Sequence, residues 1–195
     1  MNNVISQFFF KIYTRYSILR TVFKRGYLIY RYPKNTTIHP SVHLGKYTEI
    51  EINSSTASLK INEGVYFRKY CHLFLDKEGR LEIGKNVFIN NYCSINCLGK
   101  IEIGENTLIG EGVKLYDHNH KYGTVNSGLM VERNEFKIGS IEIGKNCWIG
   151  SNVTILNNVV IGDNVIIGAG CLIYKSIPAN CILKAVGNHE VKSII

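Results

Sequence analysis

The stretch from Ile143 to Ile173 reads IGKNCW, IGSNVT, ILNNVV, IGDNVI, IGAGCL and a final I, and it decides the fold. Isoleucine recurs in it at every sixth position, and each hexad carries a small or branched residue four places later, such as Cys147 or Val153. The Gly-x-Asn and Asn-Asn steps supply residues that tolerate a positive φ. A period of six fits neither a helix nor the simple alternation of a long strand.

The same repeat runs through most of the chain. Further copies stand at Ile89 and Ile95, at Ile103, Ile109 and Leu115, and more weakly from Ile38 onward. A period of six fits short strands joined by turns, and three such strands make a triangular coil whose stacked copies bury a continuous core. A β-sandwich is disfavoured because its turns do not repeat one residue type at a fixed interval. We therefore predict an all-β solenoid, a parallel β-helix.

The repeat also predicts how the chain is divided. The expected segments are a basic helical arm over 1–34, the β-helix domain over 35–177 and a C-terminal tail over 178–195. The strong half of the repeat is interrupted once, by an excursion loop at about 116–140 that is polar and carries His118 and His120. Because long excursions from a compact scaffold are often functional, we expect this one to contribute to a site.

The net charge of +8 is concentrated in the N-terminal arm. The first acidic residue is Glu49, and the chain from there onward is neutral. Apolar residues at a spacing of three to four predict a helix over 2–32 with basic residues interspersed. This helix is expected to lie on an anionic membrane surface, to cap the open end of the coil stack, or to do both. A nucleic-acid partner is not expected, because the coils are neutral and carry no recognition motif.

The six cysteines are interpreted as core residues without metal or disulfide chemistry. Cys93, Cys147 and Cys171 occupy repeat slots that elsewhere hold small apolar residues, and no C-x-x-C pair is present. Reduced thiols are typical of a cytoplasmic protein. No apolar stretch is long enough to span a bilayer, and no signal peptide is expected.

The hexads resemble those of the hexapeptide-repeat acyltransferases over roughly Ile38 to Lys175. The segment DHNH from Asp117 to His120, followed by a loop and IEIGKNCWIGSNV, is similar to the branch that contains galactoside, maltose and capsule or colanic-acid acetyltransferases. The resemblance implies a left-handed coil and a homotrimer with active sites between subunits. It also implies acetyl transfer from acetyl-CoA to a sugar or a glycan intermediate of surface polysaccharide.

Acetyl transfer needs a base that takes the proton of the acceptor, and imidazole suits this role near neutral pH. In the register of the hexads, His120 falls at the position of the family's catalytic histidine, with His118 as the alternative. Asp117 is a candidate for orienting the loop or holding an imidazole tautomer. Metal catalysis is not expected, because the other histidines lack a matching spacing.

The resemblance also suggests residues for the acceptor and the donor. Asn90 and Asn96 are the polar candidates for binding the acceptor, whereas Leu98 stands near the place of an aspartate in the galactoside enzymes. Trp148 occupies the last slot of the hexad IGKNCW, which points outward from the coil. For acetyl-CoA, the matching positions are Trp148 near the thioester, Ser151 and Ala169 along the pantetheine, and Tyr174, Lys175 and Lys192 near the phosphates. Two other functions stay open, namely N-acetyl transfer to an amino sugar or antibiotic and a non-catalytic trimeric scaffold.

Overall fold

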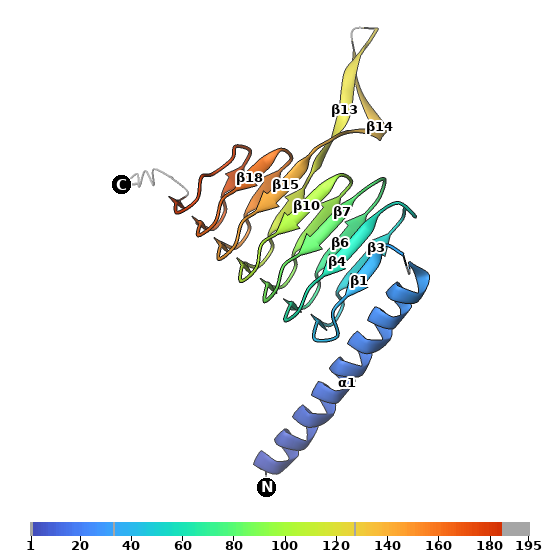
Figure 1. The fold of residues 1–195 in the computed structure, drawn as a ribbon, viewed down its shortest axis with the longest axis vertical. Helices are drawn as coiled ribbons and strands as arrows, with labels where there is room; N and C mark the ends of the chain where they lie inside the picture. The colour runs from blue at the N-terminus through green and yellow to red at the C-terminus, as the bar shows by residue number, and fades with distance from the viewer. Residues whose placement is uncertain (1, 33, 127, 185–195) are drawn as a thin grey trace, which may run out of the picture.

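The computed structural model describes residues 2–32, 34–126 and 128–184, and it describes no side chain before Tyr16. These residues form the predicted left-handed parallel β-helix, a stack of coils with a long helix at its N-terminal end (Figure 1). A two-stranded hairpin projects from the side of the stack (Figure 1). The predicted all-β solenoid is confirmed.

Each coil contributes one strand to each of three parallel sheets, which we call A, B and C. Helix α1 (Asn2–Arg31) precedes them. Sheet A contains β1 (Thr36–Ile38), β4 (Ser58–Ile61), β7 (Arg80–Ile83), β10 (Lys100–Ile103), β15 (Ser140–Ile143) and β18 (Val159–Ile161). Sheet B contains β2 (His43–Leu44), β5 (Tyr66–Phe67), β8 (Phe88–Ile89), β11 (Leu108–Ile109), β16 (Trp148–Ile149), β19 (Ile166–Ile167) and β21 (Ile182–Leu183). Sheet C contains β3 (Glu49–Ile52), β6 (His72–Leu75), β9 (Ser94–Cys97), β12 (Lys114–Tyr116), β17 (Thr154–Leu156) and β20 (Leu172–Ile173).

The chain passes from sheet A to B to C in every coil, and we name the turns between them the A–B, B–C and C–A corners. The hairpin of β13 (His118–Val125) and β14 (Gly128–Ile138) is inserted at one C–A corner, between β12 and β15. Lys100 pairs with Ser140 across this insertion, and the next coils pair in the same parallel way. The insertion therefore leaves the stacking of the coils intact.

The hexad isoleucines stack on one another inside the coil. Ile109 pairs with Ile149, and Leu115 pairs with Ile155, so like positions of successive coils lie directly above each other. All four side chains are buried, and alternate strand residues point outward because side chains alternate across a strand. Burying each such side chain contributes about 1.5–3 kcal/mol, which makes the repeat the source of the fold's stability.

Five of the six cysteines are buried, and none of them forms a disulfide. Cys93, Cys147 and Cys171 lie inside the coil in the slots that the repeat assigned to them. Burial, followed by the nearby Asp117 carboxylate, raises the pKa of the Cys97 thiol. These thiols therefore act as small core side chains, as the sequence indicated.

The A–B corner is turned by asparagine in five successive coils. Their side-chain amides form a continuous ladder with N–O distances of 3.2, 3.4, 3.3 and 2.9 Å, which links Asn86, Asn106, Asn146, Asn164 and Asn180. Each has a φ of 55° to 60°, a left-handed conformation that asparagine adopts more readily than most residues. The Asn positions of the hexads are thus explained by backbone conformation and by this ladder.

The C-terminal part of helix α1 covers the open end of the first coil, and its N-terminal part extends beyond the stack (Figure 1). Arg20 donates from Nη2 to the Leu44 carbonyl at 2.7 Å, and Arg25 donates from Nη1 to the Pro40 carbonyl at 2.6 Å. Lys24 reaches a third carbonyl of the same coil. These carbonyls have no preceding coil to bond to, so the basic side chains satisfy the exposed edge of the solenoid. The helix was predicted over 2–32, and its capping interpretation is supported by these contacts.

Two boundaries differ in detail from the sequence prediction. The excursion is not an irregular loop but an antiparallel hairpin, with a register shift between His120 and Tyr122. At the other end, β21 pairs with β19, so the coil continues past residue 177 into the expected tail. Within the described residues, no helix combines the length and the apolarity that are needed to cross a bilayer.

Candidate active site

Asp117 fastens the base of the hairpin to the coil. Its carboxylate is fully buried and accepts hydrogen bonds from the backbone N–H of Leu98 at 2.9 and 3.1 Å and of Gly99 at 2.8 Å. Its backbone carbonyl accepts from the N–H of Gly139, at the other end of the hairpin, at 2.7 Å. Asp117 thus holds both the start and the end of the excursion against the preceding C–A corner.

His118 is the imidazole that Asp117 orients. Its Nδ1 lies 2.9 Å from Asp117 Oδ1, and its side chain is only 15 % exposed. Because a carboxylate accepts hydrogen bonds, the proton of this contact belongs to Nδ1. The suggestion that Asp117 holds an imidazole tautomer therefore fits His118. The same carboxylate that orients His118 also anchors the hairpin.

His120 has a different environment, in which the ring is exposed. Its Nδ1 lies 3.0 Å from the backbone carbonyl of Glu132 on β14. A carbonyl can only accept, so Nδ1 carries the proton and the neutral ring presents its lone pair at Nε2. The sequence offered no sign of the Glu132 carbonyl, because the contact depends on the pairing of β13 with β14.

Phe136 packs against both imidazoles. Its ring centroid lies 5.2 Å from that of His118, edge to face, and 4.7 Å from that of His120. His118 and His120 share one face of β13, since side chains two apart in a strand point the same way. Asn119 points to the other face, and its Nδ2 donates to Asn157 Oδ1 of the next coil at 2.9 Å. Sequence reasoning missed both Phe136 and Asn157.

The two acceptor candidates lie at different places. Asn96 is on β9 beside Tyr116, the residue that precedes Asp117, so it lies on the strand next to the base of the hairpin. Asn90 is at the B–C corner, where its Oδ1 accepts from the N–H of Asn91 at 2.8 Å and from Arg68 at 3.3 Å. Asn90 therefore stabilises a turn, and of the two only Asn96 lies on the strand next to the base of the hairpin.

The donor candidates lie mainly on the opposite side of the coil. Trp148 is on the outer face of sheet B and is 55 % exposed, as its hexad slot predicted. Ser151 and Ala169 stand at the B–C corner. In a triangular coil, the C–A corner that carries the hairpin lies opposite sheet B, so one chain does not bring Trp148 and His120 together.

The remaining donor candidates lie toward the C-terminus. Tyr174 follows β20 at the C–A corner, is exposed, and has the Lys175 ammonium 5.8 Å from its ring centroid. Lys192 lies outside the described residues.

Comparison with known proteins identifies the family. The model of the bacterial transferase hexapeptide (six repeats) matches residues 140–175. The putative lipopolysaccharide biosynthesis O-acetyl transferase WbbJ of Escherichia coli (strain K12) is 33% identical over 146 residues, which cover 68% of this chain and 74% of WbbJ. The chain belongs to the hexapeptide-repeat acyltransferase family.

Solved structures share the fold of this acyltransferase. The N-acyltransferase AntD of Bacillus cereus superposes with a TM-score of 0.63 at 23% identity, over 81% of this chain and 82% of AntD. A hexapeptide-repeat acetyltransferase of Vibrio cholerae O1 biovar eltor, complexed with acetyl coenzyme A, gives a TM-score of 0.50 at 22% identity. That match covers 72% of this chain and 64% of the Vibrio protein. At these identities, the likeness establishes the architecture alone.

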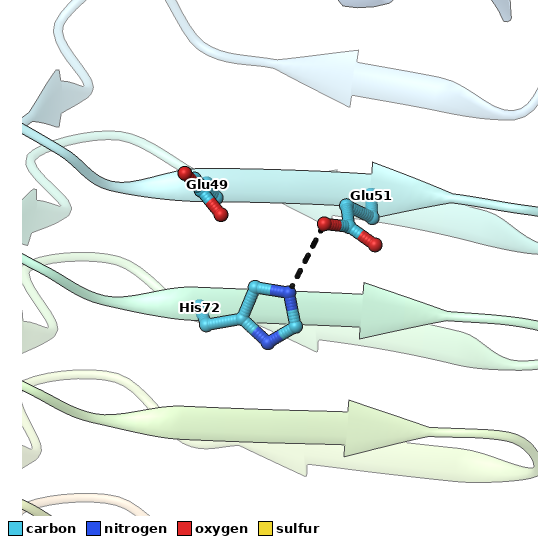
Figure 2. Close-up of side chains that lie close together, drawn as sticks. All are labelled: Glu49, Glu51 and His72. Atoms are coloured by element: carbon cyan, nitrogen blue, oxygen red, sulfur yellow. Dashed lines mark ion pairs between the residues drawn. The ribbon is translucent and has the colours of Figure 1, made fainter.

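One further group of polar side chains lies on the acyltransferase away from the hairpin. Glu49 and Glu51 on β3 and His72 on β6 lie side by side on the outer face of sheet C, with 3.5 Å between Glu51 Oε1 and His72 Nε2 (Figure 2). Their donor atoms lie within 4.8 Å of one another, but all three side chains are accessible to solvent. The group lies in the first two coils, so it forms no part of the site around His120.

Proposed function

We propose that this acyltransferase transfers an acetyl group from acetyl-CoA to a hydroxyl of a sugar in a glycan intermediate of surface polysaccharide. The relationship to a putative lipopolysaccharide O-acetyl transferase supports the substrate class. The observation that carries the chemistry is the arrangement of His120, an exposed imidazole whose Nδ1 is engaged by the Glu132 carbonyl and whose Nε2 is left to act as a base.

The proposed reaction needs one proton acceptor and one proton donor. His120 Nε2 takes the proton of the acceptor hydroxyl as its oxygen attacks the thioester carbonyl of acetyl-CoA. The tetrahedral intermediate then collapses, the C–S bond breaks, and the imidazolium returns the proton to the sulfur of coenzyme A. The Glu132 carbonyl keeps the ring in the required tautomer, and Phe136 fixes its position.

His120 is preferred over His118 because of their surroundings. His118 is mostly buried and bonded to Asp117, which itself binds the backbone of the preceding corner. His118 is therefore proposed to hold the hairpin in place, and it stays the alternative base.

We also propose that the active sites form between subunits of a homotrimer. The outer face of sheet B carries one apolar residue in each of six coils, namely Tyr66, Phe88, Leu108, Trp148, Ile166 and Ile182. A continuous apolar stripe of this length is costly to leave in water and suits an interface. Such an interface supplies what one chain lacks, since it can place Trp148 of one subunit beside His120 of another.

A peripheral position at the cytoplasmic face of the membrane is proposed for helix α1. The basic residues Arg20, Lys24 and Arg25 face the coil, so they give little support to an electrostatic contact. From Tyr16 onward, where side chains are described, the exposed ones include the apolar or aromatic Tyr16, Leu19, Phe23, Tyr27 and Tyr30. We expect sedimentation with vesicles that depends weakly on anionic lipid and is lost in Phe23→Ser. Absence of the protein from pelleted vesicles of any composition would rule out this contact.

The transfer reaction is tested by the release of free coenzyme A from acetyl-CoA. Wild type, His120→Ala and His118→Ala are compared with sugars, amino sugars and glycan fragments as acceptors. Loss of a general base typically lowers the rate by about 10²- to 10⁴-fold. The acceptor-dependent rate of coenzyme A release should therefore be lower by that factor in His120→Ala. A rate that survives in His120→Ala and is lost in a folded His118→Ala would move the base to His118. Release with amines alone would favour N-acetyl transfer.

A further inference from the structure

Three tyrosines form a ladder along the B–C corner of the first three coils. Tyr47, Tyr70 and Tyr92 occupy the same position in successive coils, and we call them the tyrosine ladder. The ring centroids are 4.8 Å apart for the first pair and 5.1 Å for the second, with interplanar angles of 21° and 7°. Each side chain is about half exposed, at 52%, 45% and 57% respectively. The ladder therefore presents its ring edges and hydroxyl groups to solvent in a row.

The backbone at this position disfavours tyrosine. Tyr47, Tyr70 and Tyr92 have φ values of 61°, 59° and 59°, in the left-handed region that is rare for bulky side chains. The same position in the next three coils is filled by glycine or asparagine, namely Gly112, Asn152 and Gly170. Core packing cannot explain tyrosine there, because the side chains are exposed. Strain that persists at an exposed position is a sign of function.

Cationic side chains accompany the ladder. Lys46 and Lys69 directly precede Tyr47 and Tyr70, and the Lys46 ammonium lies 4.6 Å from the Tyr47 ring centroid. Arg68 extends along the same corner toward Asn90. The residue at the lysine position is Asn91 in the coil of Tyr92, and its Nδ2 donates to Glu111 Oε2 of the next coil at 3.1 Å. The last two coils carry Ser151 and Ala169 there, so the cations are confined to the first two coils.

The ladder continues the corner along which the donor is proposed to lie. Ser151 and Ala169 are the candidates for the pantetheine groove, and Tyr92 is the first aromatic residue met along the corner toward the N-terminus. With a strand spacing of about 4.8 Å, the three tyrosines extend over roughly 10 Å of this corner. A long acceptor that reached the thioester could therefore extend over the ladder.

We propose that the tyrosine ladder is an acceptor subsite that binds an extended anionic glycan beyond the sugar that is acetylated. The proposal rests on the proposed function, because it places that acceptor. Phenol hydroxyls and lysine ammonium groups bind hydroxyl and carboxylate or phosphate oxygens, and the positively polarised ring edges suit the same oxygen atoms. The three cations distinguish the ladder from the apolar stripe of sheet B, which suits a second copy of this chain.

The test measures glycan binding without acetyl-CoA, so that it does not depend on catalysis. The probes are hexagalacturonate, which is anionic, and maltohexaose, which is neutral, both followed by calorimetric titration. The key variant is Tyr70→Asn with Tyr92→Asn, because asparagine already fills this position at Asn152. We expect at least a tenfold weaker binding of hexagalacturonate and a melting temperature within a few degrees of wild type.

A charge-matched pair of variants keeps the test independent of the backbone. Lys69→Ala should weaken the binding of hexagalacturonate severalfold. Lys85→Ala, which removes an exposed lysine at the A–B corner, should leave this binding unchanged. Unchanged binding in the tyrosine double variant would overturn the proposal. Loss of the trimer, or of vesicle binding, in place of glycan binding would overturn it in favour of a second copy or a lipid surface. If maltohexaose bound as tightly as hexagalacturonate and Lys69→Ala had no effect, the claim that the subsite selects an anionic glycan would be wrong.

The two proposals fail in different ways. If no acceptor supports release of coenzyme A but hexagalacturonate binds wild type and not the double variant, the subsite stands and the proposed transfer is wrong. If a monosaccharide is acetylated and the double variant binds hexagalacturonate normally, the transfer stands and the subsite is wrong.

Discussion

The coils and the hairpin of this acyltransferase are built in opposite ways. In the coils, the same kind of side chain recurs at each inward position, and like residues stack in register from one coil to the next. In the hairpin, nearly every side chain is exposed, and the important contacts occur once, such as that between His120 and the Glu132 carbonyl. The repeated residues therefore build the scaffold, and a place where the repeat is broken is a candidate functional site. The tyrosine ladder is a second departure of this kind.

The sharpest test of this contrast removes the hairpin. Replacing residues 119–137 by a short Gly-Ser linker should abolish acceptor-dependent transfer, a loss of at least about 10²-fold, because the proposed base is removed. The coils on either side pair directly, so the melting temperature should change by only a few degrees. Rates come from release of coenzyme A and stability from circular dichroism. A linker variant that still transfers acetyl groups would separate the hairpin from the chemistry.

A truncation inside the coil should show the reverse behaviour. Ile149→Ala removes a fully buried side chain and leaves a cavity, which should lower the free energy of unfolding by about 2–5 kcal/mol. Val160→Ala, at an exposed position of sheet A, is the matched control and should stay within about 0.5 kcal/mol. Urea denaturation measures both variants. Equal losses would contradict the assignment of stability to the inward repeat.

Asp117 joins the two regions, so its substitution should affect both. Asp117→Asn keeps one acceptor oxygen but turns an amide N–H₂ toward the N–H groups of Leu98 and Gly99, which should cost about 1–3 kcal/mol. Hydrogen exchange at these amides and at Gly139 should become faster. The acetyl transfer rate should fall as well, because the hairpin is held less firmly. Unchanged exchange at all three amides would show that the carboxylate is not the anchor.

The smallest effect is expected for the charged outer face of sheet A. A hydrogen bond from Lys60, at 2.7 Å, is the main cause that lowers the pKa of Glu82 below its ordinary value. A carboxyl with a lowered pKa stabilises the fold above its unfolded pKa, and this contribution is lost as pH falls through the folded pKa. Lys60→Ala should therefore cost less than about 1 kcal/mol at pH 7 and nothing at a pH below both values. Urea denaturation at both pH values measures the free energy of unfolding of wild type and Lys60→Ala. A loss of stability that persists in acid would contradict the ion pair.

The fold could be predicted because its signal is local and repeated. Each hexad contains the inward isoleucine, the small corner residue and the turn residue. The register of the coils follows when equivalent hexads are stacked. Trp148 was predicted to point outward from its hexad slot alone, and it does. The helix of the arm followed from spacing, although which of its faces meets the coil depends on carbonyls such as that of Leu44.

The site was less predictable because its contacts join residues without a repeat. Phe136 and the Glu132 carbonyl meet His120 only through the pairing of β13 with β14, and a polar excursion carries no period that reveals this pairing. The left-handed tyrosines are different, since aligning Tyr92 with Gly112 and Asn152 shows the conflict from the sequence once the coils are known.

The pairing of Lys100 with Ser140 has a consequence for how the chain folds. Ile141 pairs with Val159 in the next coil, so the connection across the hairpin is about twice as long as an uninterrupted one. Doubling a flexible loop adds only about 0.6 kcal/mol of closure entropy, so the insertion is thermodynamically mild. The insertion matters more for the folding rate. The coils before the hairpin and the coils after it can each form by local contacts, and the two blocks must then associate through β10 and β15. Docking of β15 onto β10 is accordingly the step at which an unfolded hairpin would delay the completion of the solenoid.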